Sequence, residues 1–69
     1  MKLSARNQIP AQVKAISQGE AIANVELDAQ GVRLVASITV EAVNDLGLQP
    51  GGSVTAIVKA SDVILATGE

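Results

Sequence analysis

Cysteine, histidine, phenylalanine, tyrosine and tryptophan are all missing from this chain of 69 residues. Without cysteine, no disulfide can stabilise the fold and no thiolate can hold a metal ion. Without histidine, the chain lacks the commonest metal ligand and the usual general base at neutral pH. The usual nucleophilic triads, which need one of these two residues, are therefore excluded.

Carboxylates are the groups left for acid–base chemistry, and they fall on polar faces or in a turn. We interpret these as solvated surface groups: Glu20, Glu26, Asp28, Glu41 and Asp45. A phosphate-binding glycine loop is also absent, because Gly51-Gly52 follows Pro50 in a turn and lacks the Lys and Ser or Thr that would have to follow. We therefore do not expect an enzyme.

Positive charge is scarce. The chain has five Lys and Arg residues against seven Asp and Glu residues, a net charge of −2. Proteins that bind nucleic acids normally carry a basic stripe, and many add aromatic stacking platforms, so the sequence argues against that class. Any anion site must be local, made by a few converging groups without help from the overall field.

Long apolar runs are missing too, and none approaches the roughly 18 residues of a membrane-spanning helix. Arg6, Asn7 and Gln8 interrupt the start of the chain, where a signal peptide would be apolar. We expect a cytoplasmic protein with one domain over residues 1–69. A chain this short buries only about 60% of its unfolded surface, so we expect self-association to add stability.

The apolar content, 48% of the residues, is carried by Val, Ile, Leu and Ala, which suit a narrow sheet or barrel. Alternation predicts a hairpin, with one strand over residues 21–28, a turn at Gln30-Gly31 and a returning strand over residues 32–40. Further strands are predicted over residues 3–16, 53–59 and 63–67. Pro10 in the first of these predicts a bend, a bulge or an edge position, because proline cannot donate to a sheet.

The alternation breaks after Thr39, where the sequence predicts a helix of about two turns. Thr39 is suited to the N-cap, and Gly47 to the position just past the helix end. Five strands with one short helix after the third give the order of a small all-β barrel of the OB-like type.

Two short runs stand out, Ser4-Ala5-Arg6-Asn7-Gln8 near the start and Lys59-Ala60-Ser61-Asp62-Val63 near the end. Each holds a cation two residues from a serine. In an extended segment Ser4 and Arg6 project to the same face, and the corner after Lys59 frees backbone N–H groups from the sheet. If the first and last strands meet, these donors could surround one tetrahedral dianion.

A plainer interpretation remains open at this point: Arg6 could pair with Asp62, and Ser61 could simply cap the corner. The other three cations, Lys2, Lys14 and Arg33, lack such neighbourhoods and are predicted to be ordinary surface charges.

The two runs, framing a small valine-rich domain, resemble the molybdate-binding Mop domain and its free-standing form, the molbindins. The resemblance covers essentially the whole chain. Matched by motif, it implies that molybdate is coordinated by Ser4, Ala5, Arg6, Lys59, Ala60 and Ser61. It also implies that a neighbouring subunit closes the site through residues near the end of the third strand, here Ile38, Thr39 and Val40.

The resemblance further implies a non-catalytic cytoplasmic protein that binds molybdate and tungstate for storage or homeostasis, without a cofactor or a protein-bound metal ion. The family assembles as a hexamer, a trimer of dimers, and no nucleic acid or membrane is involved. Molybdate has four acceptor oxygens and no proton to give, so donor-only groups suit it, and Asp62 is expected to point away. The alternative is a small OB-like module that binds another protein or single-stranded nucleic acid.

Overall fold

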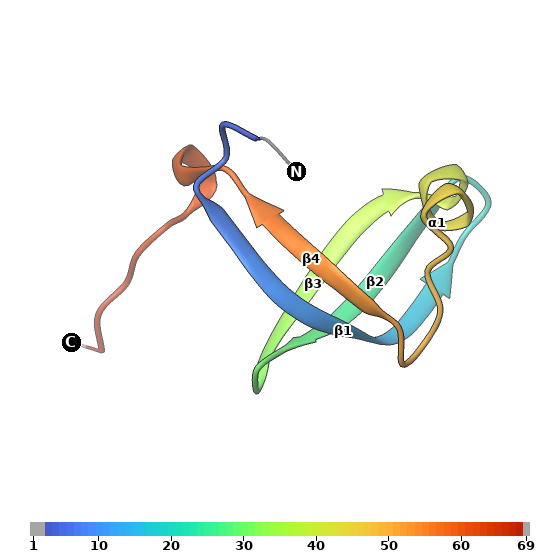
Figure 1. Ribbon diagram of the computed structural model, residues 1–69, viewed down its shortest axis with the longest axis horizontal. Coiled ribbons are helices and arrows are strands. Elements are labelled where there is room, and N and C mark those ends of the chain that lie inside the picture. The colour runs from blue at the N-terminus through green and yellow to red at the C-terminus, as the bar shows by residue number, and fades with distance from the viewer. Residues whose placement is uncertain (1–2, 69) are drawn as a thin grey trace.

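The computed structural model describes residues 3–68 and shows one antiparallel sheet with a short helix at one end (Figure 1). The elements are β1 (Asn7–Gln18), β2 (Ile22–Ala29), β3 (Val32–Thr39), α1 (Val40–Leu46), β4 (Ser53–Val58) and the 3-10 helix η1 (Ala60–Asp62). The strand order across the sheet is β3-β2-β1-β4.

The β2–β3 hairpin forms as predicted. Its turn places Gln30 and Gly31 at φ values of 56° and 91°, the left-handed region that tight hairpin turns require. The Asp28 carboxylate accepts a hydrogen bond of 2.8 Å from the Gly31 N–H, which fixes this turn. The predicted alternation is confirmed over both strands with three exceptions: Ala21 lies before β2 and is exposed, Val32 is 59% exposed, and Val40 lies in α1 rather than in β3.

The core is a single cluster of small aliphatic side chains on the inner face of the curved sheet. Its buried members are Ala11, Val13, Ala23, Val25, Leu27, Ala29 and Val43. Val13 and Val25 are the largest of the side chains that are almost fully enclosed. Half-buried residues of β3 and β4 pack against the same cluster, so both edges of the sheet border one core.

Strand β1 is long because it serves two neighbours in turn. It pairs with β4 from Asn7 to Gln12 and with β2 from Gln12 to Gln18, and its register with β2 shifts between Val13 and Ala15. Pro10 pairs with Thr55 of β4 and has no partner in β2. β1 is an interior strand of the sheet, so Pro10 does not lie on an edge strand, but the side of β1 that faces β2 is unpaired at this position.

Helix α1 begins and ends where the sequence predicts. The Thr39 hydroxyl accepts a hydrogen bond of 3.0 Å from the Ala42 N–H, and Gly47 adopts φ 64° beyond the last turn. Val43 is the helix residue that enters the core. In the described part of the chain, no helix has both the length and the apolar character to cross a membrane.

The predicted fifth strand, residues 63–67, is wrong for this structure. Within residues 3–68 the sheet has four strands and stays open, so the closed five-stranded barrel is not formed. The segment after η1 is extended but pairs with no strand, and its Ile64 and Leu65 side chains are 92% and 89% exposed. A short run of consecutive apolar residues can favour a strand, but it cannot supply the edge on which that strand pairs.

Candidate functional site

The pairing of β1 with β4 brings the two cation-bearing runs to the same end of the sheet. Asn7 pairs with Val58, and the Asn7 side-chain amide donates a 3.1 Å hydrogen bond to the Val58 carbonyl. Arg6 comes directly before this pair and Lys59 directly after it, although they are far apart in sequence. Figure 1 shows the start of the described chain and η1 beside one another at this end.

Backbone donors are left free at the same place. The corner is closed by two hydrogen bonds, from the Asp62 N–H to the Lys59 carbonyl at 2.9 Å and from the Val63 N–H to the Ala60 carbonyl at 3.3 Å. The N–H groups of Ala5, Ala60 and Ser61 make no hydrogen bond to any residue that the structure describes. Backbone N–H groups without a protein partner are available to an anion.

Among residues 3–68, no carboxylate forms an ion pair with either cation at this end. Within residues 3–68 the one ion pair joins Arg33 to Glu26, so the alternative pairing of Arg6 with Asp62 is not formed. Asp62 does not pair with Lys59 either. The described residues also contain no cluster of carboxylates that could hold a metal ion. Apart from the Asp62 carboxylate of η1, which pairs with neither cation, the groups gathered here are donors and cations, which suit a small oxyanion.

One chain leaves this cluster open to water. Ala5 is half-buried, while the other five residues expected at the site are exposed: Ser4, Arg6, Lys59, Ala60 and Ser61. Removal of a dianion from water is costly unless donors surround it. The exposed donors of a single copy of the chain can surround only one side of such an anion.

The residues expected from a neighbouring subunit lie at the opposite end of the sheet. Ile38 pairs with Ala23, which in turn pairs with Gln18 at the end of β1. The cluster sits at Asn7, roughly 35 Å away along that strand at ~3.3 Å per residue. Ile38, Thr39 and Val40 therefore do not belong to the cluster of their own chain.

Two polar groups at this far end already have partners. The Val40 N–H donates to the Ala21 carbonyl at 2.8 Å, and the Thr39 hydroxyl oxygen accepts from α1 as its cap. The hydroxyl hydrogen of Thr39 is still available as a donor, because the cap uses only the oxygen.

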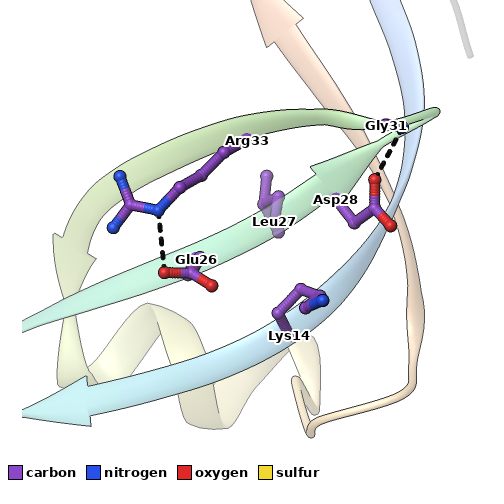
Figure 2. Close-up of a pocket in the computed structure, with 6 residues that line it drawn as sticks. All are labelled: Lys14, Glu26, Leu27, Asp28, Gly31 and Arg33. Carbon is purple, nitrogen blue, oxygen red and sulfur yellow. Dashed lines mark hydrogen bonds and ion pairs between the residues drawn. The ribbon is translucent and has the colours of Figure 1, made fainter.

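Sequence reasoning missed a shallow hollow of about 200 Å³ on the outer face of the sheet, shown in Figure 2. Its lining is Lys14, Glu26, Leu27, Asp28, Gly31 and Arg33. Arg33 Nε donates to Glu26 Oε1 at 2.9 Å, and the Arg33 side chain is 70% exposed. The signal available in the sequence was that Arg33 and Glu26 both fall on the outer face of the predicted hairpin. The two carboxylates in the lining, Glu26 and Asp28, would repel an oxyanion. Arg33 is a surface residue, as the sequence predicts. Lys2 lies outside the described residues.

Comparison with known protein families matches residues 3–65 to the TOBE domain. The chain belongs to the TOBE-domain family. It is 36% identical over 66 residues to molybdenum-pterin-binding protein 3 of Clostridium pasteurianum, covering 94% of this chain and 97% of that protein. Both cation-bearing runs, residues 4–8 and 59–63, fall inside the family match.

Solved structures show the same fold. A molybdate-binding protein from Sporomusa ovata superposes with a TM-score of 0.92 at 45% identity, covering 97% of this chain and all (100%) of that one. The cytoplasmic molybdate-binding protein ModG, solved with molybdate bound, gives a TM-score of 0.88 at 46% identity, covering 93% of this chain and 46% of ModG. The resemblance to Mop-domain proteins is confirmed by these relatives, whose names describe binding.

Proposed function

We propose that this TOBE domain binds molybdate at the end of the sheet where β1 meets β4. The proposal rests on one observation: two cations and three backbone N–H groups, none with a partner among residues 3–68, gather beside the Asn7–Val58 pair. The proposed ligands are Ser4, Ala5, Arg6, Lys59, Ala60 and Ser61. The names of the related proteins support the choice of molybdate among small oxyanions.

Each group has a distinct part in binding. The Arg6 guanidinium offers two parallel N–H groups to two oxygens of the anion, while Lys59 acts as a compact charge. Hydroxyl and backbone N–H donors complete the near side. Because all these groups donate, the site favours an anion that carries no proton at neutral pH.

A neighbouring subunit supplies the far side of the site in this proposal. The openness of the cluster on one chain supports this, and so does the position of Thr39, whose hydroxyl hydrogen is free at the opposite end of the sheet. Residues Ile38, Thr39 and Val40 of another copy would then face the anion. The assembly we propose is a hexamer built as a trimer of dimers.

The role we propose is the storage or buffering of molybdate and tungstate in the cytoplasm, with no catalysis and no cofactor, by a single Mop domain over residues 1–69. The donor set supports binding rather than chemistry, because the chain has no histidine or cysteine to act as base or nucleophile. The description of ModG as cytoplasmic supports the location.

Titration calorimetry with four anions tests the proposal. Molybdate and tungstate should compete for the same sites, with sulfate much weaker because it is smaller than the cavity made by fixed donors. Phosphate should also be weak, because Arg6, Lys59 and the backbone N–H groups cannot accept a hydrogen bond from the proton that phosphate carries at neutral pH, and only the serine hydroxyls could. Equal binding of sulfate and molybdate would overturn selective binding, and no binding of any oxyanion would favour a protein-interaction module instead.

A further inference from the structure

Two residues of the first cation-bearing run, Asn7 and Gln8, are not among the proposed ligands, yet one of them joins the two halves of the site. The Asn7 side-chain amide donates its 3.1 Å hydrogen bond to the Val58 carbonyl across 51 positions of sequence. Within residues 3–68, no other side-chain hydrogen bond joins residues more than seven positions apart. The Asn7 side chain therefore links β1 to β4 in a way that no other side chain of the described residues does.

Asparagine is an unusual residue for this position. It is depleted in strands, yet Asn7 is the first residue of β1 and is half-buried there. A residue that disfavours its own element is expected where it has a task that the element does not require. The amide of Asn7 supplies such a task, because an apolar strand-forming residue could pair its backbone with Val58 but could not donate this side-chain bond.

The bond lies where the sheet is weakest. Asn7 and Val58 form the last pair of the β1–β4 ladder, and in the described part of the chain β1 is the only neighbour of the edge strand β4. Strand ends open more readily than strand centres. Arg6 and Lys59 each lie one residue beyond this pair, whose Cα atoms are held roughly 4.5–5.5 Å apart while the ladder is closed. The Asn7 bond therefore holds the backbones of the two cations at a fixed separation.

We propose that Asn7 is a positioning residue that fixes the separation of Arg6 and Lys59 and so sets the size of oxyanion that the site accepts. The inference rests on the proposed oxyanion site. Molybdate and sulfate are both tetrahedral dianions, and sulfate is the smaller. Donors held at a fixed separation cannot close around the smaller ion, whereas donors on a loosened frame can move toward it. Loss of the Asn7 bond should therefore cost molybdate affinity and spare sulfate affinity.

Asn7→Leu tests the inference, because leucine has the same number and branching of side-chain heavy atoms but no N–H to donate. Asn7→Ala is a second variant that removes the donor without adding apolar bulk, and circular dichroism checks that both remain folded. Titration calorimetry gives the dissociation constant for molybdate, and competition against molybdate gives that for sulfate. One neutral hydrogen bond corresponds to roughly a 2- to 12-fold change in an equilibrium constant. The constant for molybdate should rise by about this factor while that for sulfate stays unchanged.

Gln8→Ala is the matched control, because Gln8 carries the neighbouring amide of the same run. Its Nε2 group donates to the Ala5 carbonyl at 3.5 Å, so its bond stays within that run and does not reach β4. The control should leave the ratio of the two constants unchanged. Equal weakening of both anions by Asn7→Leu and Asn7→Ala would overturn the role in selectivity while leaving the oxyanion site in place. A native protein that bound no oxyanion would overturn both the site and the inference.

Proton exchange of the side-chain amides, measured by nuclear magnetic resonance on the native protein, gives a readout that needs no variant. The Asn7 amide should exchange with water more slowly than that of Gln12, which is exposed and makes no side-chain hydrogen bond within residues 3–68. Slow exchange at Asn7 together with a loss of selectivity limited to the Asn7 variants would support the inference. Equal exchange rates at Asn7 and Gln12 would show that the bond is not held, and would overturn it.

Discussion

Replacement of Arg6 by alanine should weaken molybdate binding strongly without unfolding the protein. The Arg6 side chain is exposed and precedes β1, so its loss removes no core contact and no strand pairing. Hydrogen bonds to charged groups contribute about 1.5–3 kcal/mol each. Loss of one such interaction predicts about a 10- to 150-fold rise in the dissociation constant for molybdate.

Arg33→Ala is the matched control, because it lowers the net charge by the same amount. Arg33 pairs with Asp28, which pairs with Gln12 of β1. Gln12 lies five residues along the strand from Asn7, roughly 17 Å at 3.3 Å per residue. That separation exceeds the screening length of about 8 Å at physiological salt. The control should therefore change the dissociation constant less than about twofold.

Titration calorimetry at one fixed salt concentration measures the dissociation constant of each variant for molybdate. Circular dichroism checks that both variants remain folded. Arg6→Lys should also bind more weakly than the native protein, because a point charge cannot reproduce the two parallel N–H groups of guanidinium. If Arg6→Ala and Arg33→Ala weakened binding equally, the effect would be general electrostatics, and the site assigned to Arg6 would be wrong.

Three further substitutions follow from the structure. Lys59→Ala should weaken molybdate binding at least about tenfold by calorimetry, and an unchanged affinity would remove Lys59 from the site. Val25→Ala should lower the free energy of unfolding, measured in urea, by about 2–3 kcal/mol, because it removes two methyl groups from a residue that is 1% exposed. Its control, Val35→Ala at a residue that is 51% exposed, should lower that free energy by less than about 1 kcal/mol. Gly47→Ala should cost about 1–2 kcal/mol because φ is 64° there, whereas Gly68→Ala should be neutral; equal effects would refute a backbone cause.

The parts of the fold that follow from short-range signals could be predicted from the sequence. The Gln30-Gly31 turn and the capped helix depend on residues within a few positions of one another, so composition and spacing suffice. The segment over residues 63–67 could not be predicted in the same way, and the strand expected there is not formed. Its apolar pattern is real, but pairing depends on an edge elsewhere, and one chain places no edge beside it.

The candidate site also combines features that depend on neighbouring residues with features that depend on distant strand pairing. The sequence identifies which residues carry donors, because Arg6 and Lys59 each lie close to a serine. Their meeting depends on the Asn7–Val58 pair, a contact across 51 positions. Only the register of β1 with β4 brings them together. The ion pair of Arg33 with Glu26 was missed for a similar reason, since it joins residues that are not directly opposite in the hairpin.

Equilibrium dialysis against labelled molybdate, read beside metal analysis of the purified protein, tests the central claim most directly. The native protein should retain molybdate in a fixed ratio to the chain, and Arg6→Ala should retain much less at the same free concentration. Absence of molybdate binding by the folded native protein would contradict the account, as would retention by Arg6→Ala equal to that of the native protein.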